Sequence, residues 1–190
     1  MKDIKERILK DGKVLPGQIV RVDSFLNHQI DPVLMKNIGD EIKRRFKGTK
    51  ITRILTVEAS GIAIAVMAGY AMNVPVVFAQ KRRTAKLGPA VYSARVHSYT
   101  HNKDYDIAVS KNYLNEADSV LVVDDFLAMG SASLGLCNIV EQSGAKLAGV
   151  AVAIEKSFQP GGQVLRAQGI HVEAMARIKN ISGLEIEFED

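Results

Sequence analysis

The segment Ser119-Val-Leu-Val-Val-Asp-Asp-Phe-Leu-Ala-Met-Gly-Ser-Ala-Ser133 decides the fold of this chain. It begins with four consecutive apolar residues, 120–123, which are typical of a strand covered on both faces. Asp124 and Asp125 follow at once, and we expect them at the carboxyl end of that strand, where open α/β sheets bind ligands. Small residues at 128–132 then open a helical pattern. Backbone N–H groups and the helix dipole favour an anion at such a turn.

Two carboxylates beside an anion site suit a ligand that offers both hydroxyl groups and a phosphate, and a ribose 5-phosphate fits. Asp124 and Asp125 would accept hydrogen bonds from its 2′- and 3′-hydroxyls. The phosphate would be held by the backbone amides and the one hydroxyl of Ala128, Met129, Gly130, Ser131 and Ala132. The sequence contains neither G-x-x-x-x-G-K-[ST] nor G-x-G-x-x-G. The alternative is an ordinary strand-to-helix turn with a solvated pair of acids.

Length and composition suit a single α/β domain over residues 1–190. A chain of 190 residues that is 47% hydrophobic can bury a substantial core. Its single cysteine, Cys137, excludes an intramolecular disulfide and fits a reducing compartment. No apolar run approaches the roughly 20 residues of a membrane span, and the first ten residues, MKDIKERILK, are unlike a signal peptide. We therefore expect a cytoplasmic protein with no membrane partner.

The formal net charge of +4 raises the question of nucleic-acid binding. Basic residues gather at 43–45 and at 81–83, without interleaved aromatic residues or a zinc pattern. A binder of phosphate and diphosphate would also carry a small positive excess. We expect no nucleic-acid partner on this basis.

A second strand-turn-helix unit is predicted over residues 51–73. The strand at 51–57 leads into a turn with a carboxylate and a glycine, which would form a second anion site; the turn consists of Glu58, Ala59, Ser60 and Gly61. The alternative is a plain turn in which Ser60 caps the helix. The next predicted strand, at 74–79, ends just before Lys81, whose cation we expect to pair with diphosphate oxygens.

Three further segments are expected near the same edge of the sheet. A predicted strand at 147–154 leads to Lys156, which can donate to an exocyclic oxygen and would select an oxopurine. Residues 14–29 are irregular and either pack on the core or cover a flat base, with Asn27 supplying a donor and an acceptor. Residues 82–104 lose the periodicity of a core and predict either a lid or an excursion of the sheet.

The segment 119–133 resembles the phosphoribosyl-diphosphate-binding motif of the type I phosphoribosyltransferases. Three further stretches extend the resemblance to essentially the full length of the chain: 20–32, 57–61 and 154–161. The resemblance implies a mainly parallel twisted sheet flanked by helices, with a small hood from residues 14–29 and a flexible loop at about 82–104. It also implies a homodimer.

The activity implied by the resemblance is purine salvage. A 5-phosphoribosyl group would pass from 5-phosphoribosyl 1-diphosphate (PRPP) to xanthine, giving xanthosine 5′-monophosphate and diphosphate. Mg²⁺ would be bound mainly through PRPP, without a metal site made by the protein. Val20, Asn27 and Lys156 would contact the base.

The resemblance further implies that Asp124, Asp125 and Lys81 act in catalysis, and that the turn at 58–61 binds the diphosphate and often holds a strained peptide. Two positions depart from the family pattern. Val20 stands where leucine is common, and Met129 stands where asparagine is usual. The backbone amides that would bind phosphate are unaffected by either change.

Two rival functions keep the same central motif. One is a phosphoribosyltransferase that prefers hypoxanthine or guanine. The other is a nucleic-acid-binding regulator with the same fold, which should add a helix-turn-helix or a dedicated basic face. The sequence has neither feature beyond the two short basic clusters.

Overall fold

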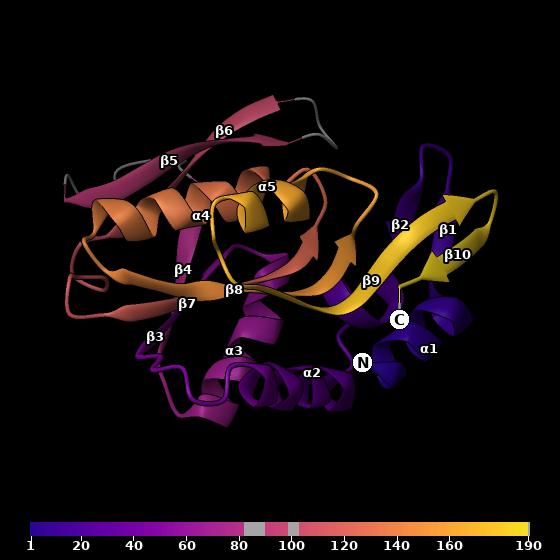
Figure 1. The fold of residues 1–190 in the computed structure, drawn as a ribbon, viewed down its shortest axis with the longest axis horizontal. Coiled ribbons are helices and arrows are strands. Elements are labelled where there is room, and N and C mark those ends of the chain that lie inside the picture. The colour runs from indigo at the N-terminus through magenta and orange to yellow at the C-terminus, as the bar shows by residue number, and fades with distance from the viewer. Residues whose placement is uncertain (82–89, 99–102, 190) are drawn as a thin grey trace.

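An eight-stranded sheet forms the centre of the protein in a computed structural model, which describes residues 1–81, 90–98 and 103–189 (Figure 1). The order of the strands across the sheet is β10-β9-β8-β7-β3-β4-β6-β5. Their bounds are β3 (Arg53–Val57), β4 (Val76–Lys81), β5 (Val91–Ser98), β6 (Lys103–Ser110), β7 (Ser119–Leu127), β8 (Lys146–Lys156), β9 (Val172–Ser182) and β10 (Glu185–Phe188).

The five strands in the middle of the sheet are parallel, as the sequence predicts. Strand β3 pairs in parallel with both β4 and β7, and β8 pairs in parallel with both β7 and β9. The strands at the two edges run antiparallel, β10 on β9 and the β5–β6 hairpin on β4. The carboxyl ends of the parallel strands therefore meet at one edge of the sheet, where such sheets bind ligands.

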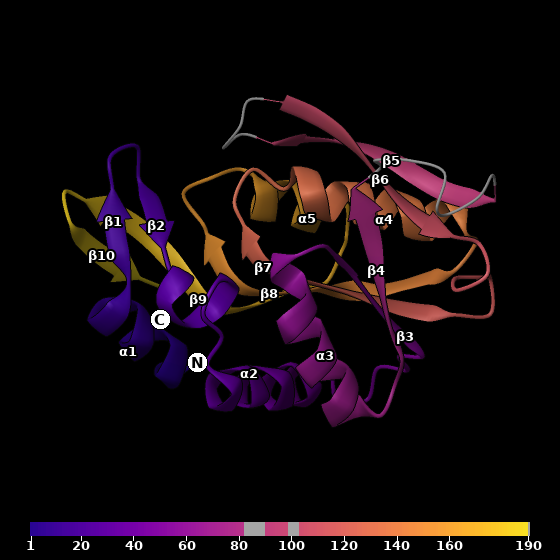
Figure 2. The same ribbon diagram turned by 180° about the vertical axis from the view of Figure 1, so that it is seen from behind.

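Helices cover both faces of the sheet (Figures 1 and 2). Helices α2 (Pro32–Arg45) and α3 (Ser60–Met72) lie on one face, and α4 (Ser131–Gln142) and α5 (Gly161–Ala167) lie on the other. Strand β7 is buried between them: Leu121 and Val123 pack with the first pair, whereas Val120 and Val122 pack with the second. No helix in the described residues is long and apolar enough to cross a membrane.

Strand β7 is longer at its carboxyl end than the apolar run predicts. Phe126 and Leu127 still pair with Ile154 and Glu155 of β8, so Asp124 and Asp125 lie inside the strand instead of after it. The difference arises because the neighbouring strand supplies backbone partners that the local sequence does not reveal. Both acids nevertheless lie among the last four residues of β7.

Residues 14–29, which are predicted to be irregular, form regular secondary structure. They contain a short hairpin of β1 (Lys13–Leu15) and β2 (Ile19–Arg21), followed by one π-helical turn, Asp23–Asn27. We call residues 14–29 the hood. Phe25 and Leu26 are fully buried in the same core as residues of α2, so this part of the segment packs on the core, as one of the two predicted alternatives has it. A single π turn has no repeat long enough to show a buried face in the sequence.

Helix α2 begins at Asp31-Pro32, a local pattern that is typical of a helix start. Asp31 caps it, because one carboxylate oxygen accepts from the backbone N–H of Val33 at 3.0 Å and of Leu34 at 3.1 Å. Pro32 occupies the first helical position, where its missing N–H costs nothing. Helix α1 (Lys2–Asp11) precedes the hood and buries Ile4 and Ile8 in the same core.

The residues predicted to form a lid or a sheet excursion include part of a hairpin. Residues 91–98 form β5, which pairs antiparallel along its whole length with β6. The excursion is the alternative that fits these residues. The remaining parts of the predicted loop, 82–89 and 99–102, lie outside the described residues.

Candidate active site

The segment between β7 and α4 has the geometry of an anion site. Gly130 is the N-cap of α4 and adopts φ +86°, a left-handed conformation that favours glycine. No side chain among the described residues caps the helix, so its first N–H groups can bind a ligand. A Cβ atom at Gly130 would lie 2.8 Å from the Cα of Gly161, so another residue here would displace the next turn. We call residues 128–132 the phosphate loop.

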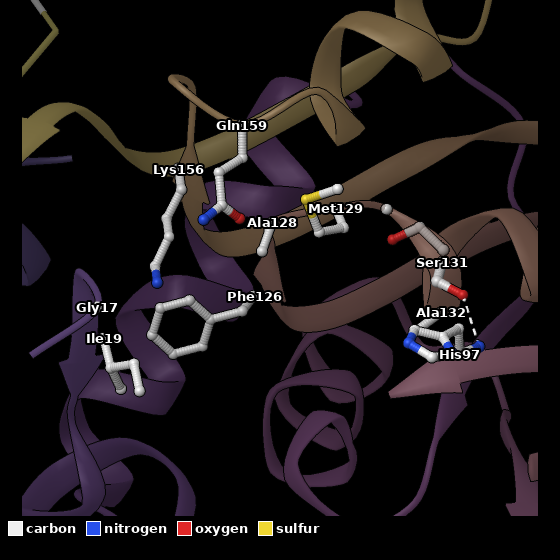
Figure 3. Close-up of a pocket in the computed structure, with 12 residues that line it drawn as sticks. Gly17, Ile19, His97, Phe126, Ala128, Met129, Ser131, Ala132, Lys156 and Gln159 are labelled. Atoms are coloured by element: carbon white, nitrogen blue, oxygen red, sulfur yellow. Dashed lines mark hydrogen bonds between the residues drawn. The ribbon is translucent and has the colours of Figure 1, made fainter. Parts of the chain in front are cut away.

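A cavity of about 470 Å³ opens along the phosphate loop (Figure 3). All five predicted phosphate-binding residues line it, and so does Lys156, the predicted base contact. The structure therefore brings these two predicted ends of the ligand site to one cavity. The sequence pattern does not indicate five of the other lining residues: Gly17, Ile19, Phe126, Ser133 and Gln159. His97 also lines the cavity, although the sequence favours a surface histidine there over a catalytic one.

Two serine hydroxyl groups lie in the phosphate loop or directly after it. Ser131 Oγ accepts a hydrogen bond from the backbone N–H of His97 at 2.9 Å, which ties β5 to the loop. Ser133 is 1% exposed, and its hydroxyl has no partner among the described residues. A buried unpartnered hydroxyl in a cavity wall is a donor available for a ligand. Its position in the first turn of α4 is the signal that could have predicted it.

The two acids of β7 are buried next to each other and contact different elements. Asp124 is 3% and Asp125 is 8% exposed. Asn27 of the hood donates to Asp125 Oδ2 at 3.2 Å. Burial, and then the neighbouring charge of Asp125, raise the pKa of Asp124 well above its ordinary value, whereas Lys81 opposes the shift. Neither acid lines the cavity directly, although Phe126, the next residue, does.

The turn after β3 lies beside Asp124. The peptide bond between Glu58 and Ala59 is cis, at the place where the family resemblance implies an unusual peptide. Helix α3 starts directly after it without a side-chain cap, so Ser60 does not cap the helix as the alternative supposed. A Cβ atom on Gly61 would lie 2.9 Å from Asp124 Oδ1, which shows how closely this turn approaches the acid pair.

Lys81 joins the same group of residues. It is the last residue of β4, and its backbone N–H donates to Glu58 Oε1 at 2.6 Å. Its ammonium group lies 5.3 Å from the centre of the Tyr105 ring. The charge of Lys81 acts on Asp124, as noted above, so the predicted catalytic cation lies near the acid pair. The adjacent arginines at 82 and 83 fall outside the described residues.

The hood meets the base end of the cavity at Lys156. Lys156 Nζ donates to the backbone carbonyl of Gln18 at 2.8 Å, and burial lowers the pKa of this ammonium group. The other two predicted base contacts lie differently. Asn27 is bonded to Asp125, and the Val20 side chain is 6% exposed and packs in the core. Its neighbour Ile19 lines the cavity instead, because side chains alternate along β2.

A buried ion cluster holds the turn that carries Lys156. Glu155 is 1% exposed and accepts two hydrogen bonds from Arg166, at 2.6 and 2.8 Å, and a third from Arg177 at 3.1 Å. Arg166 belongs to α5 and Arg177 to β9. Nearby, the backbone N–H of Gly161 donates to the carbonyl of Ala128 at 3.0 Å. This hydrogen bond joins the segment that follows Lys156 to the phosphate loop.

The described residues contain no group of three or more His, Cys, Asp or Glu side chains that could hold a metal ion by themselves. The acid pair at the end of β7 offers carboxylate oxygens, which are the ligands that Mg²⁺ prefers, but too few to form a site alone. A divalent cation here would need oxygens from a bound ligand. These residues fit a metal that arrives with its substrate.

The fold and this arrangement define a type I phosphoribosyltransferase. An adenine phosphoribosyltransferase from Rhodothermus marinus superimposes with a TM-score of 0.76, at 20% identity, over 94% of this chain and 100% of that one. The enzyme from Giardia lamblia, in complex with 9-deazaadenine, gives 0.76 at 19% identity over 93% and 98%. The enzyme from Trypanosoma brucei gives 0.75 at 21% over 92% and 80%.

Sequence comparison gives the narrower assignment. The chain is 50% identical to the xanthine phosphoribosyltransferases of Bacillus cereus strain AH187 and Bacillus anthracis strain A0248, over 188 residues, which are 99% of this chain and 95% of each relative. No protein-family model matches the chain. At this identity and coverage, the chain belongs to the xanthine phosphoribosyltransferase family.

Proposed function

We propose that this protein transfers the 5-phosphoribosyl group of PRPP to xanthine, giving xanthosine 5′-monophosphate and diphosphate, as an enzyme of purine salvage. The observation that carries the proposal is the single cavity that joins the phosphate loop to Lys156, in a chain half identical to xanthine phosphoribosyltransferases over nearly its full length. One end of the cavity offers anion donors, and the other offers an ammonium group between apolar walls.

The ribose phosphate would be held from two sides. The N–H groups of the phosphate loop and the hydroxyls of Ser131 and Ser133 would bind the 5-phosphate. Asp124 and Asp125 would accept hydrogen bonds from the ribose hydroxyls and stabilise positive charge that develops on the sugar as the C1–O bond breaks. The bond from Asn27 to Asp125 would then serve to orient a carboxylate, in addition to any contact with the base.

The leaving diphosphate would be stabilised by the turn at 58–61 and by Lys81. Backbone amides of that turn and the Lys81 ammonium group would face negative charge that grows in the transition state. Mg²⁺, when bound with PRPP, would neutralise part of the diphosphate charge. The acid pair would help to hold this cation, together with oxygens of the substrate.

The base would lie between the hood and the turn after β8. Phe126 and Ile19 supply apolar walls for a flat ring, and Lys156 supplies a donor for an exocyclic oxygen. Because Lys156 already donates to the carbonyl of Gln18, base binding would replace or share that hydrogen bond. Binding of an oxopurine would therefore change the contact between Lys156 and the hood.

The first basic cluster gives no support to a nucleic-acid-binding regulator. Arg44 and Arg45 form ion pairs with Glu41, and Lys43 donates to a backbone carbonyl in α3 at 2.7 Å. Arg45 also pairs with Glu173 at 2.9 Å. Cations that are committed to intramolecular partners contribute less to phosphate contacts on a nucleic acid.

The proposed assembly is a homodimer. Val66 and Tyr70 on α3 are 46% and 80% exposed, and Phe78 on the neighbouring strand β4 is 40% exposed. Exposed apolar side chains gathered on adjacent elements favour association. Size-exclusion chromatography with light scattering tests this, and a monomer at micromolar concentration would contradict it.

Product formation tests the proposed function directly. The purified protein is incubated with labelled PRPP, Mg²⁺ and xanthine, guanine or hypoxanthine, and the nucleotide is identified. We expect xanthosine 5′-monophosphate as the preferred product. Asp125→Asn should keep the fold by circular dichroism but lower turnover, since the amide has lost the carboxylate charge. Unchanged kinetics in this variant would remove the acid pair from the mechanism, and a preference for another base would replace xanthine as the substrate.

A further inference from the structure

His97 lies at the phosphate end of the cavity. It belongs to β5, and its backbone N–H donates to Ser131 Oγ at 2.9 Å, which places this residue beside the phosphate loop. Figure 3 shows its imidazole next to Ser131 and Ala132, at the opposite end of the cavity from Lys156. Of the described residues that line the cavity, His97 and Lys156 alone have side chains that can carry a positive charge. His97 is therefore the potential cation at the phosphate end.

Asp104 of the neighbouring strand β6 holds the imidazole of His97. The two residues face each other across the β5–β6 hairpin, and Asp104 Oδ1 lies 2.7 Å from His97 Nδ1. Arg95 pairs with the other carboxylate oxygen of Asp104 at 3.3 Å. The hydrogen bond with His97 lowers the pKa of Asp104 below its ordinary value. The carboxylate therefore stays charged and can stabilise an imidazolium ion beside it.

The contact with Asp104 determines what the ring can offer to a ligand. A carboxylate accepts hydrogen bonds, so Nδ1 of His97 carries the hydrogen in this pair. In a neutral ring Nε2 would then be an acceptor, which does not match a phosphate oxygen, whereas in an imidazolium ion Nε2–H is a charged donor. Hydrogen bonds from a charged donor to a phosphate are shorter and stronger than neutral ones. The pair with Asp104 thus favours an anionic ligand.

We propose that His97 is a further ligand of the 5-phosphate of PRPP and that Asp104 is the residue that positions it. The imidazolium Nε2–H donates to one phosphate oxygen, while the N–H groups of the phosphate loop bind the others. Because the Ser131 hydroxyl accepts from the backbone of His97, its own hydrogen can be donated to the same phosphate. This inference rests on the proposed function, since it names how that site recognises the phosphate of its substrate.

Binding of two separate probes tests the assignment. Ribose 5-phosphate carries only the 5-phosphate, whereas inorganic diphosphate with Mg²⁺ represents only the leaving group, and calorimetry measures the Kd of each. His97→Phe keeps a flat ring but removes the donor and its charge. It should raise the Kd of ribose 5-phosphate about tenfold, the low end for a hydrogen bond to a charged group, because the His97 side chain is 35% exposed. The Kd of diphosphate should change by less than about twofold.

Asp104→Asn tests the positioning role. The amide oxygen can still accept from Nδ1, but the charge that stabilises the imidazolium ion is lost, so the Kd of ribose 5-phosphate should rise about threefold. In the His97→Phe background the same substitution should have no further effect, since no imidazole remains to be positioned. Tighter binding in Asp104→Asn would show that the carboxylate only repels the phosphate and would overturn the positioning role.

His171→Phe is the matched control. His171 also pairs with a carboxylate, that of Glu173 at 3.0 Å, but it is not among the residues that line the cavity. Its substitution should leave both Kd values unchanged. In the transfer assay, His97→Phe should raise the KM for PRPP but not the KM for xanthine. Thermal melting checks the fold of each variant.

The outcomes separate the two proposals. If the unmodified protein binds ribose 5-phosphate but forms no nucleotide from PRPP and xanthine, the proposed function fails, and the binding data still decide the role of His97. If the unmodified protein is active, but His97→Phe leaves the Kd of ribose 5-phosphate unchanged or weakens both probes by the same factor, the assignment of His97 is overturned while the proposed function stands. Failure of the unmodified protein to bind ribose 5-phosphate would also overturn it. A loss confined to ribose 5-phosphate, and absent in His171→Phe, supports the assignment.

Discussion

Replacing Glu155 with alanine should both destabilise the protein and weaken base binding. Its carboxylate is 1% exposed and receives three hydrogen bonds from two arginines, as described above. Removing it leaves the Arg166 guanidinium group without its carboxylate partner, whereas Arg177 keeps its ion pair with Glu189 at 2.5 Å. The same change loosens α5 and β9 on either side of the turn that carries Lys156.

The magnitude follows from the burial of the ion cluster. Removing one partner of a buried ion pair costs about 3–5 kcal/mol because the remaining charge is left uncompensated. The side chains of Arg166 and Arg177 are 36% and 41% exposed, so water can solvate them in part. We therefore expect the lower end, a loss of about 3 kcal/mol in the free energy of unfolding. The KM for xanthine should rise about tenfold, which corresponds to about 1.4 kcal/mol.

Urea unfolding followed by circular dichroism measures the first effect, since the chain has no tryptophan for fluorescence. Glu187→Ala is the matched control, because Glu187 pairs with Lys179 at 2.7 Å but both side chains are more than half exposed. Its loss should stay below about 1 kcal/mol. A loss of stability in Glu155→Ala no larger than in this control, or an unchanged KM for xanthine, would refute the proposed role of the ion cluster.

Three further predictions concern other parts of the chain. Gly61→Ala should lower the affinity for PRPP and destabilise the fold by about 1–3 kcal/mol, because the new Cβ would lie 2.2 Å from Thr56 Oγ; calorimetry of PRPP binding and urea unfolding check this. Burial raises the pKa of the Cys137 thiol to about 11, so iodoacetamide should modify it slowly at neutral pH and rapidly in urea, and equal rates would contradict the prediction. Hydrogen bonding from Arg44 lowers the pKa of Glu41 to about 2, below its unfolded value of 4.5. The stability it contributes, about 1 kcal/mol after solvent screening, is present above about pH 4.5 and lost as the pH falls toward about 2, and Glu41→Gln should lack this part of the acid dependence in unfolding measurements.

Local patterns in the sequence are sufficient to predict the central strands and helices. The apolar run of β7, the proline and aspartate that begin α2, and the small residues before α4 each create their structure through neighbours a few positions away. The parallel sheet and the place of the phosphate loop follow from these patterns. The acid pair could be placed near the carboxyl end of β7 for the same reason, although the strand itself continues to Leu127.

The set of residues that line the cavity could not be predicted from local sequence patterns. Asn27 and Asp125 are 98 positions apart, and Lys156 and Gln18 are 138 apart, yet each pair is joined by a hydrogen bond. No periodicity relates residues at such separations, because their contact depends on how the hood packs against the sheet. The alternation along β2 shows the same limit, since Ile19 lines the cavity while Val20 is buried in the core.

The sequence by itself determined the central alternation of strands and helices, the loop of small residues before α4 and the two acids ahead of it, since these depend on side-chain patterning and backbone turns that are local. Only the tertiary structure decided which side chains share the cavity. It joined the hood to Lys156 through one hydrogen bond, buried Glu155 between two arginines, and placed Gln159 in the wall of the same cavity. Those arrangements arise from packing between segments that are distant in the sequence, so the identity of the neighbouring residues along the chain does not reveal them.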